Sequence, residues 1–172
     1  MNQLRSLIRD VPDFPEAGIV FKDIAPLLGD AAALDKALDL MTDPYRDRDI
    51  SHVAGIEARG FILATPVAVR ITAGFVPIRK PGKLPWKTVK TTYDLEYGTD
   101  SIEAHADAVA PGDRVLVVDD VLATGGTAAA AVELMRSLGA DVVGVSVLVE
   151  LSFLEGRAKL DVPITSVIVY DD

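Results

Sequence analysis

Runs of apolar residues recur along the chain and alternate with segments of helical spacing. The apolar runs are short and rich in β-branched residues, as expected of buried strands. They cover residues 53–56, 75–78, 114–118, 142–149 and 164–170. The helical patterns cover residues 30–41, 61–73 and 127–138. Strands that alternate with helices predict βαβ units, so we expect one α/β domain over residues 1–172, with a mostly parallel central sheet flanked by helices.

Individual residues mark the expected helix ends. Asp30 can cap the first long helix, because its carboxylate can accept a hydrogen bond from an N–H group of the first turn. Gly139 is placed to end the helix over 127–138. Pro66 is expected in the first turns of the helix over 61–73, where a missing N–H costs least. A further short helix is expected over residues 4–8, before a Pro-rich stretch.

One long connection interrupts this pattern. Residues 79–104 are polar, rich in Lys, Thr, Gly and Pro, and show no strong period. Connections of this length are uncommon in a compact domain unless they serve a site. Three cations, Arg79, Lys80 and Lys83, begin the segment, directly after an expected strand. The sequence therefore places a functional loop at the ligand-binding edge of the sheet.

The composition limits the classes of partner. The chain has 172 residues, and its 26 acidic and 17 basic residues give a net charge of -9. Such a surface repels nucleic acid and anionic membranes, so phosphate binding would need a local concentration of donors. The chain has no cysteine, which excludes disulfides and thiolate zinc sites. No signal sequence and no apolar stretch of about 18 residues is present, so we expect a soluble cytoplasmic protein.

The strongest chemical motif follows the apolar run at 115–118. Asp119 and Asp120 come first, and the loop Ala123-Thr-Gly-Gly-Thr127 follows, just before a helix. Adjacent glycines let backbone N–H groups face an anion, and the positive end of the helix dipole favours a phosphate. The loop alone could be an ordinary strand–turn–helix connection. Two carboxylates beside an anion site instead favour a function, because they suit sugar hydroxyls or a cation.

Other nucleotide motifs are absent. No Lys-Ser/Thr pair follows the glycines, so this is not a Walker loop, and no G-x-G-x-x-G occurs. A strand, two acidic residues and Thr-Gly-Gly-Thr resemble the phosphoribosyl pyrophosphate motif of type I phosphoribosyltransferases. Across nearly the whole chain, the similarity is to the adenine-using members of that family. The segments that carry it are 14–15, 18–28, 55–61, 79–85, 95–98 and 115–127.

The resemblance implies a fold and a reaction. The fold would have a small N-terminal hood over residues 1–30 and a flexible catalytic loop, or lid, over residues 80–105. The reaction would transfer the 5-phosphoribosyl group from 5-phosphoribosyl 1-pyrophosphate to adenine, giving AMP and pyrophosphate. Displacement at the anomeric carbon would pass through a transition state with oxocarbenium character. Mg²⁺ would be the cofactor, and the protein would be a homodimer.

The resemblance also assigns roles to residues. The catalytic residues would be Glu96, Asp119, Asp120 and Arg59, with Glu96 moving the proton of adenine and the two aspartates holding ribose hydroxyls and, indirectly, Mg²⁺. The 5-phosphate would be bound by Ala123, Thr124, Gly125, Gly126 and Thr127. Pyrophosphate would be bound by Glu57, Ala58, Arg59, Arg79, Lys80 and Lys83, with Arg79 reaching the neighbouring subunit. Adenine would be bound by Val20, Phe21, Lys22 and Leu151, while Tyr97 would belong to the lid.

Alternatives stay open at this point. Glu96 could be an exposed residue of a mobile loop, and Phe21 could be ordinary core. Sister enzymes that use hypoxanthine, guanine, xanthine or uracil share the phosphate loop. A non-catalytic regulator of the same fold would need a basic nucleic-acid-binding segment, which this acidic chain lacks. A bare α/β domain that acts through protein contacts would leave the aspartate pair unexplained. His52 and His105 have no metal-ligand or triad spacing, so neither receives a role.

Overall fold

A computed structural model of the chain describes residues 2–94 and 98–171. Its centre is a five-stranded sheet in the order β4-β3-β7-β8-β9, and every neighbouring pair is parallel. The strands are β3 (His52–Ile56), β4 (Gly74–Ile78), β7 (Arg114–Leu122), β8 (Asp141–Leu151) and β9 (Ile164–Tyr170). The α/β class and the parallel sheet predicted from the apolar runs are therefore confirmed.

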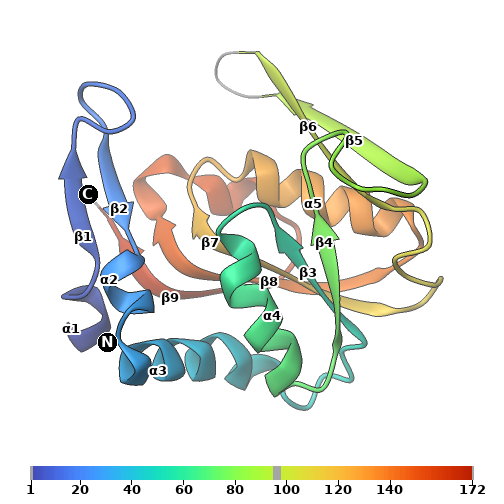
Figure 1. The fold of residues 1–172 in the computed structure, drawn as a ribbon, viewed down its shortest axis with the longest axis horizontal. Coiled ribbons are helices and arrows are strands. Elements are labelled where there is room, and N and C mark those ends of the chain that lie inside the picture. Colours follow the sequence, from blue (N-terminus) through green and yellow to red (C-terminus); the bar gives the residue numbers. More distant parts are fainter. Residues whose placement is uncertain (1, 95–97, 172) are drawn as a thin grey trace.

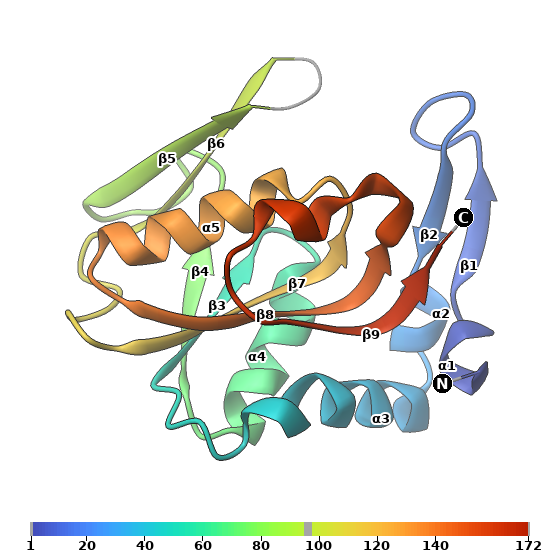
Figure 2. The same ribbon diagram turned by 180° about the vertical axis from the view of Figure 1, so that it is seen from behind.

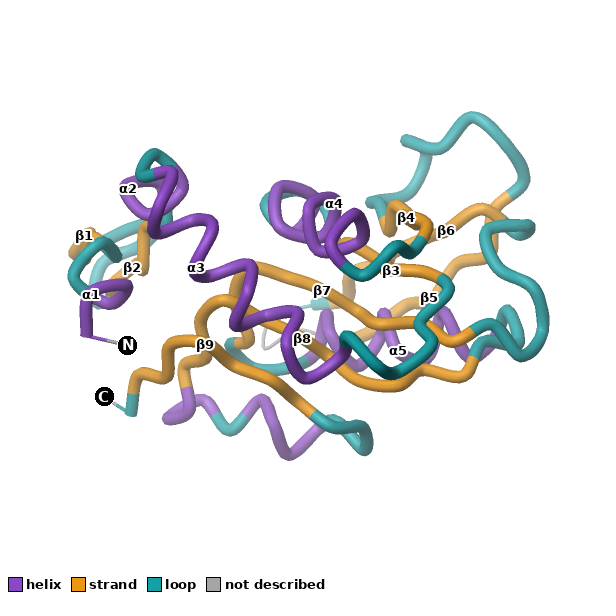
Figure 3. The backbone as a smooth tube through the Cα atoms, turned by 90° about the horizontal axis from the view of Figure 1, so that it is seen from below, coloured by secondary structure: helices purple, strands orange, loops and turns teal. Residues whose placement is uncertain are grey.

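Helices cover both faces of this sheet. α3 (Ala31–Thr42) and α4 (Gly60–Arg70) lie on one face, and α5 (Gly126–Ser137) lies on the other (Figures 1 and 2). Figure 3 shows the layers from below, with α4 and α5 on opposite sides of the strands. Each face has its own apolar cluster, one centred on α3 and α4 and the other on α5. Burial on both faces explains why the strands are continuously apolar rather than alternating.

The N-terminal residues form a separate small unit, the hood. It comprises α1 (Asn2–Arg5), β1 (Arg9–Pro12), β2 (Val20–Asp23) and α2 (Ala25–Leu28), with β1 and β2 paired antiparallel. The hood stands beside the carboxyl end of β9 (Figure 1). Cations from two of its elements flank one ring of β9: the Arg5 guanidinium lies 4.3 Å and the Lys22 ammonium 4.2 Å from the Tyr170 centroid. These contacts attach the hood to the last strand.

The polar segment is a hairpin rather than a structureless loop. β5 (Thr88–Asp94) and β6 (Thr99–His105) pair antiparallel, and the hairpin projects above the sheet on the opposite side from the hood (Figure 1). Its inner face carries Val89, Tyr93, Ile102 and Ala104, which pack against the α5 side of the core. These apolar positions do alternate, but threonine and charged residues between them hide the period. Trp86, 64% exposed, lies at the foot of the hairpin.

Local boundaries test the residue-level predictions. The Asp30 carboxylate accepts a hydrogen bond from Ala33 N–H at 2.9 Å, which confirms the cap, and Gly139 has φ 93° just after α5. The prediction for Pro66 was wrong: α4 begins at Gly60, so Pro66 occupies its middle. The described residues also include three short 3₁₀ turns: η1 (Asp43–Tyr45), η2 (Ser152–Leu154) and η3 (Gly156–Lys159). Among the described helices, none is long and apolar enough to cross a membrane.

Candidate active site

The site cavity lies where the sheet changes its direction of winding. The chain leaves β3 towards β4 on one side and leaves β7 towards β8 on the other, although β3 and β7 are neighbours. Loops that follow such a pair diverge and leave a crevice beyond the carboxyl ends of the strands. A cavity of about 450 Å³ lies there. It is lined by Ile19, Val20, Phe21, Lys22, Ile56, Glu57, Ala58, Arg59, Ile78, Lys80, Ile102, Asp119, Asp120, Val121, Ala123, Thr127 and Leu151.

The phosphate loop encloses a second, smaller hollow. Residues 121–128 and Asp119 line a space of about 90 Å³, adjoining the site cavity at Asp119, Val121, Ala123 and Thr127. Gly125 has φ 78°, a left-handed conformation that glycine adopts without strain, and α5 starts at the next residue. All five residues predicted to bind the 5-phosphate line this hollow. Its size and its position at the start of a helix suit one phosphate group.

A glycine distant in sequence supports the phosphate loop from behind. A Cβ atom on Gly156 would lie 2.0 Å from the carbonyl oxygen of Ala123, and one on Gly125 would lie 2.2 Å from the carbonyl oxygen of Gly156. The two backbones can therefore approach only because both residues are glycine. The buried Glu150 carboxylate fixes η3 in place by accepting hydrogen bonds from Arg157 and Ser166. The sequence analysis did not identify Gly156, because no local motif marks it.

Asp119 and Asp120 lie inside β7, which extends to Leu122, further than predicted. Burial and the neighbouring Asp120 carboxylate raise the pKa of Asp119 well above its usual range. Burial also raises the pKa of Asp120, although nearby Arg59 opposes the rise. A Cβ atom on Gly60 would lie 2.7 Å from Asp119 Oδ1, so the start of α4 packs directly on this carboxylate. The pair is thus a closely confined acidic group that lines the cavity, with Asp120 buried and Asp119 half-buried.

Arg59 spans the cavity from the β3 side. Its Nε lies 2.7 Å from Asp120 Oδ2, an ion pair whose alignment is not that of a hydrogen bond. The same guanidinium lies 4.8 Å from the centroid of the Phe21 ring. A single cation therefore contacts both the aspartate pair and the hood.

Glu57 gathers the cations that follow β4. Its carboxylate accepts hydrogen bonds from Arg79 at 3.2 Å and from the Lys80 backbone N–H at 2.9 Å, and it also contacts the Lys83 ammonium. Burial raises the pKa of Glu57, but the hydrogen bonds from Lys83, Lys80 and Arg79 outweigh it and bring the pKa to about 2. The residues predicted to bind pyrophosphate are thus in one cluster, with Arg79 and Lys83 at its outer side.

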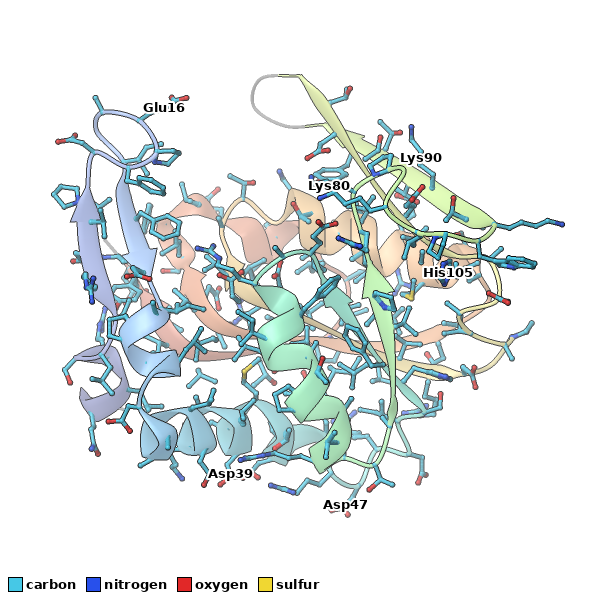
Figure 4. All side chains as sticks on the ribbon, viewed as in Figure 1. Glu16, Asp39, Asp47, Lys80, Lys90 and His105 are labelled. Carbon is cyan, nitrogen blue, oxygen red and sulfur yellow. The ribbon has the colours of Figure 1, made fainter. Side chains whose placement is uncertain are left out.

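The Lys80 side chain points away from Glu57, towards the hairpin. Its ammonium contacts the Asp100 carboxylate on β6 and lies 3.5 Å from the Tyr93 hydroxyl on β5. The Tyr93 hydroxyl in turn lies 3.2 Å from Thr127 Oγ1 in the phosphate loop. In Figure 4 the labelled Lys80 lies beneath the hairpin. Neither Tyr93 nor Asp100 was identified from the sequence, because the segment was expected to lack regular pairing.

The hood contributes the opposite wall. Val20, Phe21 and Lys22 line the cavity, as does Leu151 at the end of β8. Phe21 is half-buried and faces the cavity, so it is not ordinary core. Phe14 contacts the Phe21 ring edge-on, with centroids 5.1 Å apart. This wall is mainly apolar, as suits a flat uncharged ring.

Some predicted residues are not placed at the site. Glu96 and Tyr97 lie outside the described residues. His52 contacts Ser51 and Asp113 near the amino end of β3, away from the cavity. Over residues 2–94 and 98–171, no group of three or more His, Cys, Asp or Glu is arranged to hold a metal ion.

Comparisons with known proteins agree with this geometry. Residues 28–171 match the family model of the phosphoribosyl transferase domain. The adenine phosphoribosyltransferase of Thermobifida fusca is 62% identical over 153 residues, which are 89% of this chain and 87% of the relative. The crystal structure of the Rhodothermus marinus adenine phosphoribosyltransferase has a TM-score of 0.95 and 51% identity, covering 98% of this chain and 97% of that one.

A further solved structure contains ligands. It is adenine phosphoribosyltransferase from Saccharomyces cerevisiae, complexed with D-2,5-dideoxy-2,5-imino-altritol 1,6-bisphosphate and adenine. Its TM-score is 0.92 at 37% identity, covering 96% of this chain and 97% of that one.

Proposed function

The chain belongs to the phosphoribosyl transferase domain family and, within it, to the adenine phosphoribosyltransferases, and on that premise we propose its reaction. The protein transfers the 5-phosphoribosyl group from 5-phosphoribosyl 1-pyrophosphate to adenine, giving AMP and pyrophosphate. One observation supports this most strongly: a phosphate-sized hollow adjoins a larger cavity whose walls are cationic on one side and apolar on the other. The two aspartates lie between them, where a ribose would join the two groups.

The donor would bind across the carboxyl ends of β3 and β7. Its 5-phosphate would occupy the hollow of residues 123–127, held by backbone N–H groups, the hydroxyls of Thr124 and Thr127, and the start of α5. Its diphosphate would lie towards residues 57–59 and the cations Lys80, Lys83 and Arg79. In this structure the cations contact carboxylates, and the diphosphate would replace Glu57 beside Arg79 and Lys83 and Asp120 beside Arg59. Lys80 would keep Asp100 and donate its remaining N–H groups to the diphosphate.

Asp119 and Asp120 would accept hydrogen bonds from the ribose hydroxyls. We propose Mg²⁺ as the cofactor, held by these aspartates through water or through donor oxygens. The pair fits such an ion, because both groups are confined and, in the described part of the chain, Asp120 Oδ2 has no hydrogen-bond donor. The ion would stabilise negative charge on the departing diphosphate.

Adenine would bind between the hood and Leu151. Its ring would stack on Phe21, whose free face is covered by Arg59 in this structure, so base and diphosphate binding both require that guanidinium to move. The backbone of Val20 and Lys22 would provide the hydrogen bonds that recognise the edge of the base, since a flat uncharged ring offers no charge to bind.

The chemical step would form a C–N bond at the anomeric carbon as the C–O bond to pyrophosphate breaks. Little covalent help is needed, so catalysis would come from positioning and from the cations that receive the diphosphate. The base nitrogen loses its proton, and we propose Glu96 as the group that accepts it. The hairpin β5–β6 contributes Ile102 to the lining of the cavity, and its closure over the donor would exclude water.

A base-by-base assay tests this function. The purified protein is incubated with the sugar pyrophosphate, Mg²⁺ and adenine, hypoxanthine, guanine, xanthine or uracil in turn. We expect rapid AMP and pyrophosphate formation with adenine and far slower product with the other bases. Faster turnover of another base would reject the acceptor, and product from none of them would reject the enzyme.

We propose that two copies form a homodimer through the outer face of α4. Ile62 and Val69 lie on the same face of this helix and form an apolar stripe; they are 49% and 75% exposed. Phe75 on the edge strand β4 continues the patch, with its ring edge-on to Phe61. A contiguous apolar surface on an edge strand and the adjacent helix favours burial against a second copy. In the single chain Arg79 contacts Glu57, and in the dimer it would also reach towards the partner's site.

We propose a cytoplasmic location for this activity. A chain without cysteine needs no oxidising compartment, and its sugar pyrophosphate donor is a highly charged metabolite that does not cross membranes unaided.

A further inference from the structure

The Tyr93 hydroxyl joins the two phosphate-binding parts of the site. It lies 3.2 Å from Thr127 Oγ1, in the loop for the 5-phosphate, and 3.5 Å from the Lys80 ammonium, which faces the diphosphate region. Its third neighbour is Asp100 Oδ2, at 3.3 Å. Tyr93 belongs to neither phosphate loop, since it projects from the hairpin strand β5.

These three contacts match the hydrogen-bonding capacity of a phenol. A tyrosine hydroxyl donates one hydrogen bond and accepts two. Here it donates to Asp100 and accepts from Thr127 and Lys80. All the hydrogen bonds that this hydroxyl can make are therefore in use, so the position of its oxygen fixes the separation between Thr127 Oγ1 and the Lys80 ammonium.

The contacts can persist when ligand is bound. If the Thr127 hydroxyl turns to donate to a phosphate oxygen, the Tyr93 hydroxyl can donate to Thr127 Oγ1 instead. Asp100 then keeps the Lys80 ammonium as its partner, and that ammonium has three N–H donors to share. Burial lowers the pKa of the Lys80 ammonium, but its contacts with Asp100 and Tyr93 outweigh this effect and raise the pKa overall.

The core fixes the Tyr93 ring itself. The ring packs against the apolar cluster on the α5 side of the sheet, and Tyr93 is paired in register with Asp100 across the hairpin. The hydroxyl is therefore held by the fold rather than by the ligand. A preorganised spacer of this kind favours a ligand that spans both subsites.

We propose that Tyr93 is a positioning residue for the donor: it sets the spacing between Thr127 and Lys80, and so favours a molecule with phosphates in both subsites over molecules that fill one. This inference rests on the proposed function for the identity of the donor. A purely structural role of Tyr93 would weaken all phosphate ligands alike, or none.

The test compares Tyr93→Phe with the parent. This change removes the hydroxyl and keeps the packed ring. We expect the KM and Kd for 5-phosphoribosyl 1-pyrophosphate to rise about tenfold, as loss of a hydrogen bond to a charged group would give, and kcat to change less than about threefold. The Kd for pyrophosphate alone and for ribose 5-phosphate alone, measured by calorimetry, should change less than about twofold.

The matched control is Thr92→Val. Thr92 lies next to Tyr93 on the outer face of the same hairpin, where its Oγ1 is 3.0 Å from Ser101 Oγ. It should leave all five constants within twofold of the parent. Melting temperatures of both variants confirm that the fold is retained.

Several outcomes would overturn the proposal. They are an unchanged donor Kd in Tyr93→Phe, an equal loss for the single-subsite ligands, or an equal effect of Thr92→Val.

If Tyr93→Phe does not fold, Asp100→Asn replaces it, because this change removes the charge that holds Lys80. Weaker donor binding in Asp100→Asn supports the proposal, and unchanged or tighter binding refutes it. Calorimetry needs no turnover, so a parent that binds the donor without using any base rejects the proposed function and leaves this test intact.

Discussion

The three cations that line the cavity each contact a different carboxylate. Arg59 is paired with Asp120, Lys80 with Asp100, and Lys22 with Asp10. Each described cation that lines the cavity thus has a carboxylate partner before any ligand arrives. An acidic protein can keep phosphate-binding cations ordered in this way, because each partner offsets the entropy of fixing a long side chain.

The aspartate pair gives the first prediction. Replacing Asp119 and Asp120 together by Asn should lower kcat by about a hundredfold or more, because the ribose loses two charged hydrogen-bond acceptors. Steady-state kinetics measures the loss, and thermal unfolding should show a melting temperature no lower than the parent's, because two closely confined carboxyl groups that repel each other are replaced. The exposed Asp107→Asn variant is the control. Near-normal turnover in the double variant would remove the aspartates from the mechanism.

Glu57 gives a prediction about acid stability. Its pKa falls from 4.5 to about 2 on folding, so the folded state binds fewer protons than the unfolded chain between those values. Its contribution to stability is therefore complete above pH 4.5 and is lost as the pH falls towards 2. Urea unfolding at several pH values should show a smaller loss across this window in Glu57→Gln than in the parent. The same slope in both proteins would contradict the depressed pKa.

The sequence predicted most residues of the cavity but missed those whose roles depend on contacts between segments distant in sequence. Residues 123–127 and the aspartate pair are contiguous, so their chemistry is visible in one motif. Gly156, Tyr93 and Asp100 acquire their roles from segments that meet only after folding. The hairpin was missed for a related reason: its inner face alternates correctly, but Thr91 and the polar outer face weaken the apolar signal.

At the scale of elements, η3 and the phosphate loop behave as one unit. Their backbones are in contact through Gly125 and Gly156, and the Glu150–Arg157 ion pair secures the far side of η3. The loop geometry is therefore set by a turn about 30 residues away in sequence as much as by its own glycines.

Gly156→Ala tests this contact. The added methyl would meet the Ala123 carbonyl oxygen, so either the loop or η3 must shift. We expect the KM for the sugar pyrophosphate to rise about tenfold or more, in line with a displaced phosphate-binding loop. Gly29→Ala is the matched control, because its added Cβ would meet nothing closer than 3.5 Å. Equal KM values for Gly156→Ala and the parent would show that the loop tolerates the methyl.

At the scale of the whole molecule, one parallel sheet supports two smaller units, the hood and the hairpin β5–β6. The hood and the hairpin rise on opposite sides of the same sheet edge (Figure 1), so base and donor would approach from different sides. The order of strands, predicted only as a parallel sheet, determines this arrangement: β3 and β7 are neighbours although 57 residues separate the ends of one and the start of the other. No local pattern in the sequence encodes that adjacency.

The proposed dimer gives a prediction at this scale. Val69→Lys puts a charge on the most exposed residue of the apolar stripe on α4, where burial against a second copy would leave it unpaired. Sedimentation velocity should show a dimer for the parent and mainly monomer for this variant at the same concentration. Glu16→Gln, which changes the net charge by the same amount at the tip of the hood (Figure 4), should stay dimeric. A monomeric parent would reject the interface outright.

Trp86 makes the hairpin optically visible. It is the one tryptophan of the chain and lies 64% exposed at the foot of β5. Excitation at the long-wavelength end of the protein absorption band therefore excites this indole and not the tyrosines of the core. Any rearrangement of the hairpin would change the polarity around a single fluorophore, so its emission can be followed in a stopped-flow mixer with the unlabelled natural protein. Trp86 would thus report closure of the proposed lid without any added label.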